Sequence, residues 1–116
     1  MIKSVHTINA APADASKTGP AVQAETTQRA SIIATIAGAT VGPVGTLYLE
    51  ASNQPADPGE NEPPSGSWAT VDSVAFAANG TDGVTVPGCA YRWLRARWAY
   101  TSGTAGTINV YMQANG

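Results

Sequence analysis

The stretch that decides the fold class of this chain is Ala90-Tyr-Arg-Trp-Leu-Arg-Ala-Arg-Trp-Ala-Tyr100. It holds two of the three tryptophans, two of the four tyrosines and three of the six basic residues. Aromatic residues are mediocre helix formers and favour strands, and the flanking sequence is rich in Thr, Val and Gly. The stretch therefore predicts a β-strand.

Alternation of side chains gives this strand two faces. One face carries Leu94, Ala96 and Trp98, which predicts a buried surface. The opposite face is aromatic and cationic, and it consists of Tyr91, Trp93, Arg95 and Arg97. Because such a composition is unusual for a solvated sheet, we expect something to cover this face.

Three interpretations of the aromatic and cationic face stay open. Its rings and guanidinium planes could stack on a sugar or a nucleobase. The same residue types are also typical anchors of a protein interface. Alternatively, Arg95 and Arg97 could pair across the sheet with Glu50, a contact worth at most about 1 kcal/mol. The last two interpretations are compatible with each other.

Strand signals recur along the rest of the chain, separated by Gly, Pro, Asn and Asp. The cleanest alternation is in residues 45–52, where Leu47, Leu49 and Ala51 share one face. Other strands are predicted in residues 21–29, 31–37, 68–76, 84–86 and 107–114. Residues 90–100 and 107–114 are expected to pair as a hairpin. With no amphipathic helix, this pattern predicts one all-β domain, an antiparallel β-sandwich of jelly-roll-like form.

The first 20 residues have a different character from the rest. Residues 1–9 contain a short alternating segment, and residues 10–20 collect Pro12, Pro20 and Gly19 among small polar residues. We therefore divide the chain into an extended N-terminal arm at 1–20 and a β-sandwich domain at 21–116. The arm could add a strand to a partner, with Val5, His6 and Ile8 as candidate contacts.

Composition limits the classes of partner. Charged residues make up 12% of the chain and the net charge is −2, which does not favour nucleic acid or an acidic membrane. Of the apolar residues, 21 are alanine, so the core is lean and gains from burial against neighbouring subunits. We expect a homo-oligomer, a dimer or trimer. The single Cys89 excludes a disulfide within the chain.

Catalytic chemistry has little support in the sequence. His6 is the only histidine and lies in the predicted arm, so we assign no catalytic, cofactor-binding or metal-binding residues. Asp57, Glu60 and Glu62 lie on a Pro-rich loop at 53–67 without the spacing of a calcium loop. Whether that loop holds a metal stays open, and the chain is expected not to be an enzyme.

Four stretches carry a resemblance to a known family: Gly45-Thr-Leu-Tyr-Leu-Glu-Ala-Ser-Asn53, Trp68-Ala-Thr-Val71, Tyr91-Arg-Trp-Leu-Arg-Ala-Arg97 and Gly106-Thr-Ile-Asn-Val110. Together they resemble small β-sandwich, jelly-roll-like virion proteins of tailed bacteriophages over residues 21–116. The same stretches are also similar to discoidin-like carbohydrate-binding sandwiches.

The phage resemblance implies a non-enzymatic virion protein of the capsid decoration (cement) type. Such a protein would be made in the host cytoplasm and would bind the major capsid protein at joints on the capsid surface. The alternative is a carbohydrate- or receptor-binding module of a phage tail or fibre. That alternative requires Tyr91, Trp93 or Trp68 to be exposed as a stacking platform.

Overall fold

A computed structural model of the protein describes residues 2–23, 29–38, 44–52, 68–87, 93–103 and 106–115. Predictions on the 53–67 loop, Cys89 and Tyr91 lie outside these residues. The described strands are β1 (Ile2–Pro12), β2 (Lys17–Thr18), β3 (Val22–Gln23), β4 (Arg29–Ala37), β5 (Val44–Ser52), β6 (Ala69–Phe76), β7 (Gly80–Pro87), β8 (Trp93–Ser102) and β9 (Thr107–Asn115). The described residues contain no helix, so none that could cross a membrane, and the all-β prediction is confirmed.

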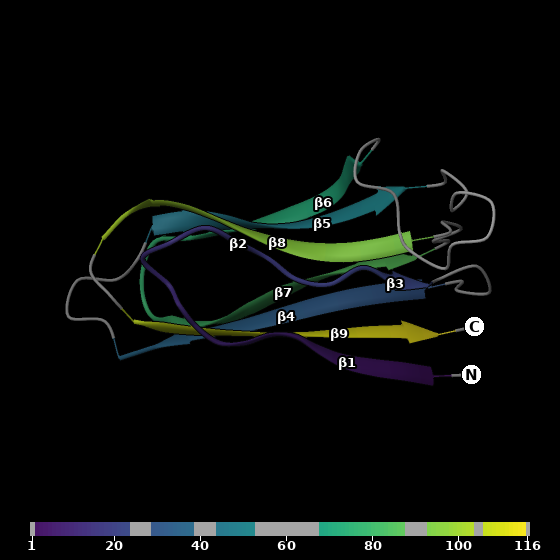
Figure 1. Cartoon of the computed structure of the whole chain (residues 1–116), viewed down its shortest axis with the longest axis horizontal. Coiled ribbons are helices and arrows are strands. Elements are labelled where there is room, and N and C mark those ends of the chain that lie inside the picture. Colours follow the sequence, from purple (N-terminus) through teal and green to yellow (C-terminus); the bar gives the residue numbers. More distant parts are fainter. Residues whose placement is uncertain are drawn as a thin grey trace.

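The strands form two antiparallel sheets stacked face to face (Figure 1). The first sheet has the order β1-β9-β4-β7, and the second has β2-β8-β5-β6 with β3 also paired to β8. The pairs are nested about the middle of the chain: β5 with β6, β4 with β7, β2 and β3 with β8, and β1 with β9. A long hairpin wrapped into two sheets in this way is a jelly roll.

The core lies between the sheets and follows the predicted alternation. Leu47 and Leu49 of β5 and Leu94, Ala96 and Trp98 of β8 are buried, as predicted. The first sheet contributes isoleucines of β1, β4 and β9 together with Val110 and Met112. Five of the buried core positions are alanine: Ala13, Ala30, Ala34, Ala51 and Ala96.

Trp98 is the largest fully buried side chain, and a glycine makes room for it. A Cβ atom at Gly45 would lie only 2.6 Å from the indole of Trp98 and 2.5 Å from the carbonyl oxygen of Ala99. Phe76, which pairs with Gly45 in the register of β5 and β6, meets the indole edge to face at 6.0 Å between ring centroids. Gly45, Phe76 and Trp98 therefore pack directly against one another within the core.

The N-terminal segment differs from the sequence-based prediction. Residues 2–12 form β1, which pairs along its length with β9 of the same chain and buries Ile8 in the core. The division into an arm at 1–20 and a sandwich at 21–116 is therefore wrong: β1 is an integral edge strand (Figure 1). The physical reason is that β9 has a second hydrogen-bonding edge, opposite the one paired with β4, and β1 satisfies it while burying Ile8 in the core.

Residues 13–19, which include the short strand β2, carry the chain from one sheet to the other. The N–H of buried Ala13 donates to the carbonyl oxygen of Gly106 at 2.9 Å. The N–H of Gly19 donates to the carbonyl oxygen of Ala96 at 2.8 Å, and the N–H of Tyr100 donates to Oγ of Ser16 at 3.0 Å. The small and Pro-flanked residues that suggested an arm are thus those of a tight crossover.

The predicted hairpin between the last two strands is also wrong. β8 belongs to the second sheet and β9 to the first, so the turn between them crosses the sandwich. β9 instead lies between β1 and β4, and Ile108 of β9 pairs with Ile36 of β4. Nesting of the pairs gives β9 a partner on both edges, β1 on one and β4 on the other, so neither edge of β9 is open to β8.

Candidate functional site

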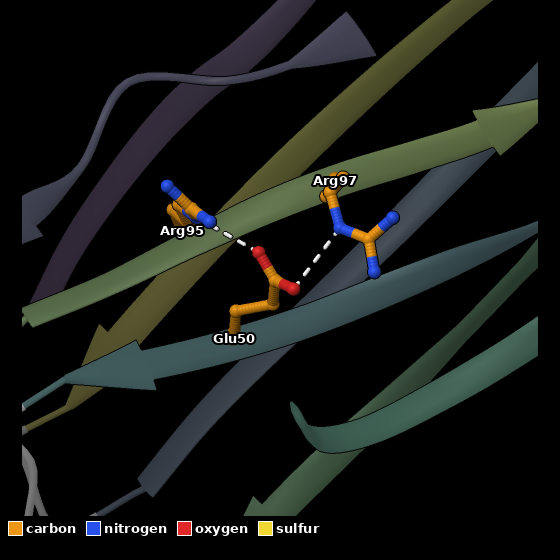
Figure 2. A network of polar contacts seen from close by, with 3 residues as sticks. All are labelled: Glu50, Arg95 and Arg97. Atoms are coloured by element: carbon orange, nitrogen blue, oxygen red, sulfur yellow. Dashed lines mark hydrogen bonds and ion pairs between the residues drawn. The ribbon is translucent and has the colours of Figure 1, made fainter. Parts of the chain in front are cut away.

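The outer face of the second sheet carries a group of five side chains, here called the arginine cluster: Tyr48, Glu50, Trp68, Arg95 and Arg97. The register of β5 and β8 places Glu50 opposite Arg95, and Tyr48 opposite Arg97. Nε of Arg95 donates to Oε1 of Glu50 at 2.8 Å, and Nε of Arg97 donates to Oε2 at 3.0 Å (Figure 2). The predicted pairing of both arginines with Glu50 is confirmed.

Aromatic rings support both guanidinium groups of the arginine cluster. The guanidinium carbon of Arg95 lies 4.1 Å from the centroid of a Trp68 ring, and that of Arg97 lies 4.3 Å from the Tyr48 ring centroid. Both distances are within the range of cation–π contacts. Exposed fractions are 23% for the Arg95 side chain, 36% for Arg97 and 8% for Glu50. The carboxylate is therefore covered while the guanidinium groups stay accessible.

Trp93 shares the outward face of β8 with the two arginines, yet only 4% of it is exposed. Its Nε1 is buried and has no hydrogen-bond partner within the described parts of the chain. The expectation that something covers this face holds at Trp93. Because the ring is covered, Trp93 does not offer a surface on which a ligand could stack.

The other predicted contact residues are spread over the molecule. Val5 and His6 lie in β1, where their backbones pair with Met112 and Tyr111 of β9. Their side chains lie outside what the structure describes. Ile8 is buried in the core of its own chain, so its assignment as a partner contact is wrong. The structure thus does not bring Ile8 together with Arg95 and Arg97 into one site.

The outer face of the first sheet was not singled out from the sequence. Ile33 of β4 and Tyr111 of β9 are directly opposite each other and each is 49% exposed. We call this surface the Ile33–Tyr111 face. Its other described outward residues are uncharged apart from Arg29 at one end: Ser31, Thr35, Ala37, Thr81, Gly83, Thr85, Thr107, Asn109 and Gln113.

A groove of about 370 Å³ lies beside Ile33 on the same face. Gly83 of β7 pairs with Ile33, and its missing side chain opens this groove between β4 and β7. A Cβ atom at Gly83 would lie 2.3 Å from the carbonyl oxygen of Ile32, so the strands approach too closely for any other residue. The sequence does hold a signal for this face, because adjacent Ile32 and Ile33 cannot both point into the core.

Within the part of the chain that the structure describes, no group of three or more His, Cys, Asp or Glu side chains could hold a metal ion. The acidic residues of the 53–67 loop lie outside that part.

No protein-family model and no curated protein sequence matches the chain. Solved structures share its fold, among them XepA and PirA. XepA, an exported protein of the phage PBSX, is similar with a TM-score of 0.64 at 18% identity, over 99% of this chain and 37% of that chain. PirA is similar with a TM-score of 0.53 at 12% identity, over 99% of this chain and 92% of that chain. This chain spans little more than a third of XepA, and at these identities the likeness establishes the β-sandwich fold.

Proposed function

We propose that this chain is a non-enzymatic structural protein of a phage virion, a decoration protein that binds the major capsid protein on the capsid surface. The observation that carries the proposal is the Ile33–Tyr111 face. Two large side chains, each 49% exposed, lie opposite each other on this face, and its other described outward residues carry no charge apart from Arg29. An apolar centre with a polar rim is the usual anatomy of a protein interface.

Two further observations support a role in a phage particle. The sequence resembles small virion sandwiches of tailed phages, and XepA of the phage PBSX shares the fold. The lean core, with alanine at five buried positions, gains stability from burial of the Ile33–Tyr111 face against a neighbour. On this proposal the chain assembles as a dimer or trimer around a joint between capsid proteins.

The described tryptophans favour this proposal over a carbohydrate- or receptor-binding module of a tail or fibre. Stacking on a sugar needs an accessible ring. Trp93 and Trp98 are buried, and Trp68 already contacts the guanidinium of Arg95. We therefore retain the module only as the alternative that the experiment below must exclude.

Binding to capsids that lack this protein tests the proposal. Ile33→Asp and Tyr111→Asp each place a charge at the centre of the face, and each should weaken capsid binding at least about tenfold, the scale of one large apolar side chain. Thr101→Asp is the matched control, because Thr101 is exposed on β8 in the other sheet. Capsid occupancy is measured by co-sedimentation.

Two outcomes would contradict the proposal at different levels. Equal occupancy by the Ile33→Asp variant and wild type would reject the Ile33–Tyr111 face as the contact. Absence of wild-type protein from capsids, together with saturable binding of neutral host glycans, would reject the decoration role and favour the alternative.

A further inference from the structure

Within the described parts of the chain, the ion pairs with Glu50 use only one N–H donor of each arginine in the arginine cluster. A guanidinium group carries five N–H donors, and Glu50 accepts from only the Nε of each arginine. Among the described residues, the terminal nitrogens of each arginine carry four further N–H donors that these two bonds do not use. Figure 2 shows the terminal nitrogens of Arg97 directed away from Glu50. The end of that guanidinium can therefore donate two parallel hydrogen bonds to the two oxygens of a second oxyanion.

The charges of the cluster do not balance. One carboxylate faces two guanidinium groups, which leaves a local charge of +1 in a chain whose net charge is −2. Glu50 is 8% exposed, whereas Arg97 is 36% exposed. An approaching anion therefore meets the positive groups first, and the negative charge lies beneath them.

The guanidinium groups are also held in place before any ligand arrives. Each is fixed in its plane by one bond to Glu50 and by stacking on Trp68 or Tyr48. Stacking engages the face of a guanidinium and leaves its in-plane donors unused. Because little side-chain freedom remains to be lost, binding costs less entropy than it would at an isolated surface arginine.

Hydroxyl side chains stand at neighbouring positions of the same sheet. The register places Thr18 of β2 opposite Arg97, Ser73 of β6 opposite Tyr48, and Thr70 of β6 opposite Glu50. These residues are exposed and can donate to further oxygens of a bound group. A site with charged donors and hydroxyls fits a carboxylate or phosphate better than an apolar ligand.

We propose that Arg95 and Arg97 form a binding site for a carboxylate or phosphate group, with Glu50, Trp68 and Tyr48 as the residues that position them. The site lies on the opposite side of the sandwich from the Ile33–Tyr111 face, so it is independent of the proposed capsid contact. A single oxyanion at such a partly exposed pair should bind with a dissociation constant of about 1–10 mM.

NMR of the full chain tests the site directly, because the Nε–H signals of arginine report on the groups involved. Sodium phosphate, sodium glucuronate and neutral glucose are titrated at constant ionic strength. Phosphate, glucuronate or both should shift the Arg95 and Arg97 signals in a saturable way, and glucose should not. Saturation by phosphate alone identifies a phosphate site, and saturation by glucuronate alone identifies a carboxylate site.

Variants distinguish a binding site of defined geometry from nonspecific attraction of anions to positive charge. Arg97→Gln should weaken binding at least about tenfold, and Arg97→Lys should weaken it nearly as much, because lysine keeps the charge but lacks the planar pair of donors. Arg29→Gln is the control, since Arg29 is an exposed arginine on β4 of the other sheet. Circular dichroism confirms that each variant is folded.

The proposal is overturned by either of two results. One is a wild-type protein whose Arg95 and Arg97 signals do not saturate with either anion up to about 50 mM, well above the expected dissociation constant. The other is anion binding that is unchanged by Arg97→Gln and Arg95→Gln, which would place the anion elsewhere.

Discussion

The indole Nε1 of Trp98 donates a hydrogen bond of 3.0 Å to the carbonyl oxygen of Ala13. Trp98 lies in β8 of the second sheet, and Ala13 follows directly after β1 of the first. Both residues are fully buried, and they are 85 positions apart in the chain. This one bond satisfies the polar atom of the largest core side chain and ties the N-terminal crossover to the opposite sheet.

Replacement of Trp98 should destabilise the fold strongly. Trp98→Phe removes the donor, leaves the carbonyl oxygen of Ala13 buried without its partner, and opens space in the core. We expect the free energy of unfolding to fall by about 2 kcal/mol or more, measured by urea denaturation. Trp68→Phe keeps a ring under Arg95 and should cost about 1 kcal/mol or less. Equal losses in the two variants would contradict the role of this bond.

Gly45 should not tolerate a side chain. In Gly45→Ala the new methyl group would lie within 2.7 Å of the Trp98 ring and of the Ala99 backbone, so the core must shift. Overpacking of this kind costs about 1–3 kcal/mol and should lower the melting temperature by several degrees. Thr46→Ala at the adjacent outward position is the control. A melting temperature as high as that of wild type would show that β5 and β8 can separate at no cost.

Removal of residues 1–12 should abolish cooperative folding. The deletion exposes one whole edge of β9 and removes buried Ile8 from the core. The milder Ile8→Ala should cost about 2–5 kcal/mol, whereas Asn9→Ala at an exposed position should cost little. Thermal unfolding followed by near-ultraviolet circular dichroism measures both effects. A deletion variant that still unfolds cooperatively would restore the interpretation of this segment as an arm.

The two ion pairs of Glu50 should differ in strength. Double-mutant cycles with Glu50→Ala, Arg95→Ala and Arg97→Ala should give coupling energies of about 0.2–1 kcal/mol, with the Arg95 pair the stronger. Arg95 is less exposed, at 23% against 36%, and its bond is shorter. Both couplings should fall in 1 M salt, where the Debye screening length shortens to about 3 Å. A stronger Arg97 pair would contradict this order.

Local patterning predicted the strands well wherever one face of a strand is buried and the other is not. In β5 and β8 the alternation identified Leu47, Leu49, Leu94 and Trp98 as core residues, and all are buried. It also placed Glu50 and the arginines on one outer face, where they pair. These features follow from the two-residue period of side chains in a strand, which can be recognised from the sequence of the strand alone.

Edge strands and exposed faces were harder to predict. β1 was interpreted as an arm because its alternation is followed by Pro12 and Gly19, and no local signal tells a crossover from a flexible segment. The outward direction of Ile33 in β4 was not predicted from the sequence, although 49% of the residue is exposed. Its direction follows from the partners of β4, which bury Ile32 and Ile36 and leave Ile33 on the opposite side.

What this sequence determined by itself is the strand class and the buried faces of β5 and β8, and it offered the pairing of Glu50 with Arg95 and Arg97 as one of three interpretations. Only the tertiary structure decided which strands are neighbours. A short turn after β8 is compatible with a hairpin or with a crossing between sheets, and the choice depends on where β9 finds apolar partners. It finds them in β1 and β4, where paired residues such as Ile2 and Asn115 are up to 113 positions apart in the sequence. Contacts over such distances depend on the packing of the whole chain, which no local pattern records.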